Sequence, residues 1–265
     1  MISSALIYSA LLFNLTLISA SELKRQVEPS VFKLIVTLSD GQESAGTGFL
    51  ISDTGHMVTN NHVIDGASKI IAENNGQIRI PVKRGFYARN EDHDLAIIQL
   101  DLNQAPGGFI ARPLQLANDT KAMGGGEEIY VLGHPGGEKI AEFTIGSITA
   151  VEQEPRKLRF DASIHRGSSG SPMFNAMNGE VIGVVYSFWT GAAKLNYATP
   201  VEYLHEMLAK LDVDPILLPF RTPAKSSKRF GSGSGSSSGL PINLIISVAF
   251  FAAVYFGIRR ILRAA

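Results

Sequence analysis

Cysteine is absent from all 265 residues of this chain. Its absence excludes a disulfide framework, a thiol nucleophile and any zinc site built on thiolates. Net charge is absent too, because 24 lysine and arginine residues balance 24 aspartate and glutamate residues, and the basic residues are spread along the chain. A nucleic-acid partner therefore has no electrostatic support. The sequence shows no cluster of metal ligands, and we expect neither a metal nor a cofactor.

Apolar residues make up 45% of the chain, enough for a substantial core, and one apolar run lies near the N-terminus. Residues 6–20 are apolar but too few to cross a bilayer comfortably, and polar residues follow them. This pattern predicts a signal peptide at residues 1–21, cleaved near Ala20 or Ser21. No basic residue precedes the run and Ile18 is large for its place before the cut, so an uncleaved anchor is the alternative.

A second apolar run lies near the C-terminus. Residues 240–258 carry no charge and are numerous enough to span a bilayer, which predicts a transmembrane helix. Arg259, Arg260 and Arg263 follow directly, so by the positive-inside rule residues 259–265 form a cytoplasmic tail. The preceding domain would then lie on the extracytoplasmic side, be it periplasmic, lumenal or extracellular. A processed sorting signal of the GlyGly type is the alternative.

Between these ends we predict a folded domain at residues 26–215 and a proline-rich, then Gly/Ser-rich linker at residues 216–239. Short strands separated by turn residues predict an all-β barrel or sandwich. The expected strands cover residues 31–39, 46–52, 77–82, 95–100, 128–133, 142–153, 157–163, 180–188 and 194–199. One helix is expected after Pro200, where apolar residues recur at helical spacing.

A loop of small residues, GSSGSP at residues 167–172, lies between two of the expected strands. Its glycines allow a sharp turn that can present two backbone amides to a developing negative charge, with Ser169 at the centre as a candidate nucleophile. Taken alone, such a hexapeptide fits an ordinary loop equally well.

Hydrolysis by a serine also needs a base and an acid that holds the base. His62 is the candidate base, because it follows the end of a short apolar strand-like segment. Asp94 is the candidate acid, because it alone adjoins the apolar run at residues 95–100. Glu91 and Asp92 are the alternatives for this role.

Five segments in one order resemble the protease domain of the HtrA (Deg) family, within the wider trypsin-like peptidases. The resemblance covers roughly residues 28–208, and its segments are GTGFL at 46–50, TNNHV at 59–63, DLA at 94–96, GHPGG at 133–137 and DASIHRGSSGSP at 161–172. The order His, Asp, Ser is that of chymotrypsin. The resemblance implies an all-β fold of two perpendicular six-stranded antiparallel β-barrels with a C-terminal helix, and an active site in the cleft between the barrels.

The resemblance also implies roles for single residues. Ser169 would be the nucleophile, His62 the general base and then acid, and Asp94 its orienting partner. The backbone amides of Gly167 and Ser169 would form the oxyanion hole. The family usually has glycine where this chain has Ser171, which adds a side chain near the site without removing a required group.

Three further expectations follow from position. Ser168 stands where zymogen-derived trypsins have the aspartate that pairs with a new N-terminus, so we expect activity without zymogen cleavage. Ser163 is uncharged and Leu195 would fill the specificity pocket, so we expect small or aliphatic P1 residues; the alternative for Leu195 is ordinary strand core. The sequence leaves no room for a PDZ domain after the barrels.

These features together predict a membrane-tethered serine endopeptidase that hydrolyses extracytoplasmic polypeptides through an acyl-enzyme intermediate. The alternative is a proteolytically silent trypsin-fold module that binds or chaperones other proteins. The complete set of catalytic residue types favours the enzyme, since a binding module does not need all three.

Overall fold

The computed structural model describes residues 19–83, 87–190 and 193–211. Most of the predicted signal peptide, and the whole of the predicted linker, transmembrane helix and cytoplasmic tail, lie outside these residues. Within the described part of the chain, no helix is both long enough and apolar enough to cross a membrane.

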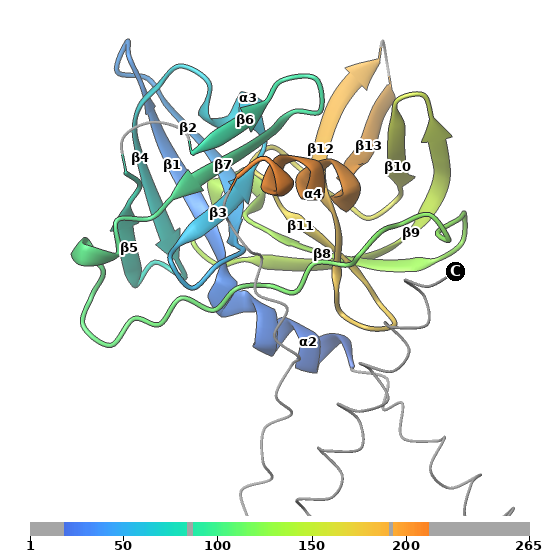
Figure 1. Cartoon of the computed structure of the whole chain (residues 1–265), viewed down its shortest axis with the longest axis horizontal. Coiled ribbons are helices and arrows are strands. Elements are labelled where there is room, and N and C mark those ends of the chain that lie inside the picture. Colours follow the sequence, from blue (N-terminus) through green and yellow to red (C-terminus); the bar gives the residue numbers. More distant parts are fainter. Residues whose placement is uncertain (1–18, 84–86, 191–192, 212–265) are drawn as a thin grey trace, which may run out of the picture. The chain divides into compact units, whose positions relative to one another are not determined.

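The N-terminal half of the domain forms one antiparallel sheet, drawn in blue to green in Figure 1. Its strand order is β5-β4-β1-β2-β3-β7-β6. The strands are β1 (Val31–Leu38), β2 (Glu43–Leu50), β3 (His56–Thr59), β4 (Ala67–Asn74), β5 (Ile78–Pro81), β6 (Ala88–Asn90) and β7 (Leu95–Gln99). The prediction of a six-stranded barrel is therefore wrong for this half, which is a seven-stranded open sheet in the described residues.

The two sides of this sheet nevertheless approach each other just beyond β5 and β7. Val82 and Leu100 form an isolated antiparallel bridge, and the amide of Lys83 donates a hydrogen bond to the carbonyl of Gln99. β6, which pairs with the other end of β7, has only three residues. The sheet thus curls toward a barrel without a continuous ladder to close it.

The C-terminal half forms a closed six-stranded barrel, as predicted. Its order is β10-β13-β12-β11-β8-β9, and every pair of neighbours is antiparallel. The strands are β8 (Glu128–Gly133), β9 (Glu142–Gln153), β10 (Arg156–Phe160), β11 (Pro172–Asn175), β12 (Val181–Thr190) and β13 (Ala193–Pro200). Closure leaves no free edge strand in this half.

Short helices complete the described domain. They are α2 (Ala20–Val27), α3 (Asn61–Ile64) and α4 (Val201–Ala209), with 3-10 turns η1 (Glu28–Ser30), η2 (Leu102–Gln104) and η3 (Pro135–Gly137). The predicted helix after Pro200 is α4, which buries Val201, Leu204 and Leu208. α4 packs against β12 and β13 and also contacts β6, so it links the two halves.

The apolar strand β7 shows how the halves are joined. Successive side chains of a strand point to opposite faces. Leu95 and Ile97 pack in the core shared with the C-terminal barrel, while Ala96 and Ile98 pack inside the N-terminal sheet. An unbroken apolar run is what a strand buried on both faces requires. Asp94, which directly precedes this strand, is consequently held at the junction of the two halves.

Candidate active site

His62 and Asp94 meet at this junction through two hydrogen bonds. The ring Nδ1 of His62 lies 2.6 Å from Oδ2 of Asp94, and the backbone amide of His62 donates to Oδ1 at 2.9 Å. An ionised carboxylate only accepts hydrogen bonds, so Nδ1 carries the proton and Nε2 is the free acceptor. The His62 side chain is 51% exposed and that of Asp94 only 28%, so the carboxylate lies behind the ring and the ring faces solvent.

The backbone around Asp94 is held in an unusual conformation. Its φ of 50° lies in the left-handed region, which aspartate tolerates better than most residues. The Asn60 side-chain amide and the Asn61 backbone amide both donate to the Asp94 carbonyl, at 2.9 and 3.2 Å. Asn60 is a site residue that no local pattern marks, although it lies in the TNNHV segment, two residues before the candidate base.

The two alternative carboxylates lie elsewhere. Glu91 pairs with Arg89 at 2.6 Å. Asp92 lines a small cavity to which Asp94 also contributes, but neither Glu91 nor Asp92 is hydrogen-bonded to His62 in the described structure. Asp94 is thus the acidic residue that orients the imidazole.

Ser169 lies in the loop that precedes β11. The shape of this loop depends on Gly167. The φ of Gly167 is 92°, and a Cβ there would come 2.4 Å from the carbonyl oxygen of His134. Any other residue would therefore be strained in φ and would also collide with the neighbouring turn. The backbone amides of Gly167 and Ser169 donate to no protein acceptor within the described residues. Both amides remain available to a ligand.

His62 and Ser169 line one cavity of about 660 Å³ between the two halves. The cavity is lined by Glu43, Ser44, Ala45, His62 and Val63 from the N-terminal half and by Gly136, Gly137, Arg166, Gly167 and Ser169 from the C-terminal half. In the described structure the Ser169 hydroxyl makes no hydrogen bond, and catalytic contacts of this kind often tighten only when substrate binds. The cavity thus holds a hydroxyl, a free imidazole nitrogen and two free amides, which is the equipment for acyl transfer.

Ser171, where the family usually has glycine, is not part of the lining of this cavity. Its side chain is fully buried, and a Cβ on Gly133 would lie 1.9 Å from the Ser171 hydroxyl oxygen. Gly133 of β8 therefore provides the space that the extra side chain occupies. The serine is thus accommodated against Gly133 of β8.

The remaining predicted site residues lie outside the cavity lining. Ser163 is exposed between β10 and the Ser169 loop, and Leu195 is half-buried in β13, paired with Phe188 of β12. Ser168 is buried, and its hydroxyl accepts a hydrogen bond from the His165 amide within the same turn.

His134 belongs to the turn that supports the Ser169 loop. Its ring is fully buried, and Nδ1 lies 2.9 Å from the Glu138 carbonyl, to which it donates. Burial, helped by the charge of nearby Lys33, lowers the pKa of His134 below its ordinary value, so the ring is neutral. Gly136 in the same turn donates its amide to the Arg166 carbonyl.

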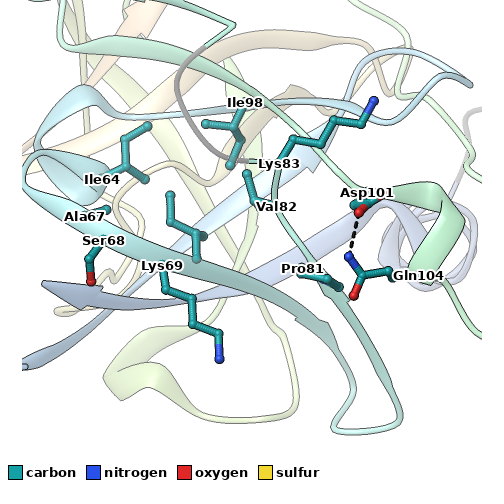
Figure 2. Close-up of a pocket in the computed structure, with 11 residues that line it drawn as sticks. Ile64, Ala67, Ser68, Lys69, Pro81, Val82, Lys83, Ile98, Asp101 and Gln104 are labelled. Atoms are coloured by element: carbon teal, nitrogen blue, oxygen red, sulfur yellow. Dashed lines mark hydrogen bonds between the residues drawn. The ribbon is translucent and has the colours of Figure 1, made fainter.

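A second concavity, of about 370 Å³, lies on the N-terminal sheet (Figure 2). Apolar side chains such as Ile64 and Ile98 line it, together with Lys69 and a hydrogen-bonded pair in which Gln104 donates to Asp101 at 2.6 Å. Its described lining has no base beside a nucleophile. Of these two cavities, the one that contains His62 brings an imidazole and a serine hydroxyl together.

Comparison with known proteins agrees with this geometry. The family model for a trypsin-like peptidase domain matches residues 46–184, which include His62, Asp94 and Ser169. The chain belongs to the trypsin-like peptidase family. Among curated relatives of this peptidase domain, the uncharacterized protein y4bJ of Sinorhizobium fredii is 31% identical over 65% of the chain. A probable periplasmic serine endoprotease DegP-like of Halomonas elongata is 30% identical over 66% of it. The likeness to the HtrA (Deg) family is thereby confirmed.

Solved structures share the fold of this trypsin-like peptidase domain. An HtrA-type protease AlgW with tripeptide superposes with a TM-score of 0.62 at 23% identity, covering 72% of this chain and 63% of that one. The serine endoprotease from Yersinia pestis gives 0.59 at 24% identity, covering 72% and 66%. The matched segment spans only 28% of the Sinorhizobium relative and 37% of the Halomonas relative.

Proposed function

We propose that this chain is a serine endopeptidase that hydrolyses polypeptides. The observation that carries the proposal is the 2.6 Å contact between His62 Nδ1 and the Asp94 carboxylate, in a cavity that the histidine shares with Ser169. The names of the Halomonas relative and of the solved neighbours describe proteases, which supports the same class of reaction.

The proposed reaction proceeds in two halves. Ser169 Oγ attacks the scissile carbonyl carbon while His62 Nε2 takes the hydroxyl proton, and Asp94 stabilises the resulting imidazolium. The Gly167 and Ser169 amides donate to the oxyanion. The intermediate then collapses, the C–N bond breaks, and His62 returns the proton to the leaving amine. Water, deprotonated by His62, attacks the acyl-enzyme in the same way and releases the new carboxylate and Ser169.

Cleavage of an unfolded protein tests this proposal. Wild-type protein should degrade reduced, denatured casein, and Ser169→Ala should not, with both variants folded by circular dichroism. A wild-type chain that binds casein and leaves it intact would refute the enzyme and favour the silent binding module.

We propose a preference for small or aliphatic P1 residues. The support is that Ser163 carries no charge to attract a basic side chain and that Leu195 is apolar. A peptide library with varied P1 residues tests this: valine and alanine should give the highest kcat/KM. A preference for arginine or lysine would contradict it.

We further propose that residues 240–258 tether the domain to a membrane on its extracytoplasmic side. The support is the uncharged span followed by three arginines, and the periplasmic description of the Halomonas relative. Full-length protein should resist extraction from membranes by alkaline carbonate, and a variant ending at residue 225 should be extracted. Mass measurement of the mature C-terminus tests the processed sorting signal, which would shorten the chain before residue 240.

A further inference from the structure

Thr47 of β2 reaches from the N-terminal sheet to the Ser169 loop of the C-terminal barrel. It is fully buried, and its hydroxyl lies 2.8 Å from the Gly167 carbonyl oxygen. Its backbone amide donates to the Ser169 carbonyl, also at 2.8 Å. One residue of one half therefore holds two peptide groups of the loop that carries the candidate nucleophile.

The Thr47 hydroxyl is the donor in this bond, because a carbonyl oxygen only accepts, and a second contact agrees with this direction. The His134 backbone amide donates to Thr47 Oγ1 at 3.0 Å. A threonine hydroxyl has one hydrogen to donate, and the available acceptor is the Gly167 carbonyl. Thr47 Oγ1 thus accepts from the supporting turn and donates to the loop, so it connects both segments.

These bonds complete a set that restrains four consecutive carbonyls. The Arg166 carbonyl accepts from Gly136, the Ser168 carbonyl accepts from the Ser171 amide at 3.1 Å, and the carbonyls of Gly167 and Ser169 accept from Thr47. Because each peptide group is planar, holding a carbonyl also fixes the N–H of the next residue. The held carbonyls of Arg166 and Ser168 thus orient the N–H groups of Gly167 and Ser169, which donate to nothing in the described residues. The Thr47 hydroxyl holds the 167–168 peptide between them, whose N–H donates to the His165 carbonyl at 3.0 Å.

Of the four donors, three are backbone amides and one is a side chain. The Thr47 hydroxyl is the donor that a substitution can remove while the fold is retained. Without it, the carbonyl of the 167–168 peptide loses its hydrogen bond, the peptide is held only through the Ser168 amide, and Gly167 has no side chain to resist rotation.

We propose that Thr47 is a positioning residue: by holding the 167–168 peptide that lies between the Gly167 and Ser169 amides, it keeps these two amides aimed at one oxyanion site. The inference rests on the proposed peptidase function and deepens it. It assigns to the N-terminal half a second task, besides supplying His62 and Asp94: holding the oxyanion hole of the other half in its productive shape.

The test compares Thr47→Val, which keeps the side-chain shape and loses the hydroxyl, with Thr47→Ser, which keeps the hydroxyl. Steady-state cleavage of a peptide substrate and the rate of labelling by a fluorophosphonate are measured beside thermal unfolding. Thr47→Val should lose about tenfold to a hundredfold in kcat and in labelling rate, with KM nearly unchanged. Thr47→Ser should restore both rates.

Thr120→Val is the matched control. Thr120 is also a buried threonine, but its hydroxyl bonds to Glu202 on α4, away from the cavity. The Thr120→Val variant should have a lower unfolding temperature than wild type and the same labelling rate. If Thr47→Val does not fold, Thr47→Cys, whose thiol is a weak donor, replaces it and should label more slowly than Thr47→Ser.

Equal labelling by wild type and Thr47→Val, or a Thr47→Ser variant as slow as Thr47→Val, would overturn this inference alone. A wild-type protein that neither cleaves nor labels would overturn the proposed peptidase function, and the positioning role with it. The two failures are therefore distinguishable in one set of experiments.

Discussion

Asp94 and His62 are joined by contacts that set which ring nitrogen carries the proton. Replacing Asp94 with Asn puts an amide beside Nδ1, which permits the opposite tautomer and leaves Nε2 protonated. We predict that Asp94→Asn lowers kcat by roughly 10⁴-fold, as expected for a triad aspartate. Asp92→Asn, which changes a neighbouring carboxylate that makes no hydrogen bond to His62, is the control. Comparable kcat values for the two variants would contradict the role given to Asp94.

Gly133 and Ser171 form a complementary pair behind the Ser169 loop. Gly133→Ala should destabilise the fold by about 1–3 kcal/mol, because the added methyl collides with the Ser171 hydroxyl. Adding Ser171→Gly should recover much of that loss. Urea unfolding of both single variants and the double variant measures the coupling.

Gly124→Ala serves as the control for this cycle, since a Cβ there meets nothing within 4 Å. Strictly additive effects of Gly133→Ala and Ser171→Gly would show that the two positions do not share space.

At the level of single residues, much of the site could be predicted from the sequence. His62, Asp94 and Ser169 are found by motif, because their chemistry restricts the residue types around them. Asn60 and Thr47 act by hydrogen bonds to distant backbone groups, 34 and 120 positions away along the chain. Such partners depend on how two halves pack, and no local pattern reports them.

Among the elements, strands with a clear apolar pattern were predicted well. β8 (Glu128–Gly133) and β9 (Glu142–Gln153) agree with the expected bounds at both ends. β4 was missed because the exposed polar residues Ser68 and Lys69 interrupt its apolar pattern, and β11 because it begins at Pro172, which disfavours a strand assignment. Both segments form strands because they pair with neighbouring strands of the sheet, although their own composition does not predict a strand.

Two buried histidines, His134 just before turn η3 and His56 in β3, give the stability of the fold a pH dependence. Burial lowers the pKa of both His134 and His56, so the unfolded chain binds these protons more tightly than the folded chain. The stability they confer is fully present above the unfolded pKa of about 6.5 and declines as the pH falls below it. We therefore predict a lower free energy of unfolding at pH 5.5 than at pH 7.5.

His134→Asn tests the contribution of His134 to this pH dependence. The asparagine side-chain amide can still donate to the Glu138 carbonyl but does not titrate. The slope of unfolding free energy against pH should fall by up to about 1.4 kcal/mol per pH unit, the value for one proton. Urea denaturation at several pH values measures it. An unchanged slope would mean that His134 does not titrate on unfolding.

On the scale of the whole molecule, the Ser169 loop is held, within the described residues, by contacts from both halves of the domain. Ser168 bonds within its own turn, and α2 is anchored by the buried side chains of Leu23 and Val27. We predict that activity needs no free N-terminal ammonium group. Protein carrying an uncleavable N-terminal extension should label with a fluorophosphonate as fast as protein that begins at residue 22. Labelling that appears only after a cut within residues 21–45 would contradict this.

The proposal as a whole depends on Ser169 being a nucleophile activated by His62. Full-length protein is incubated with a fluorophosphonate, and the adduct is located by peptide mass mapping. The account predicts one adduct, on Ser169, that is lost in both Ser169→Ala and His62→Ala. An adduct on another serine, an adduct that persists in Ser169→Ala, or no adduct on the folded wild-type protein would contradict it.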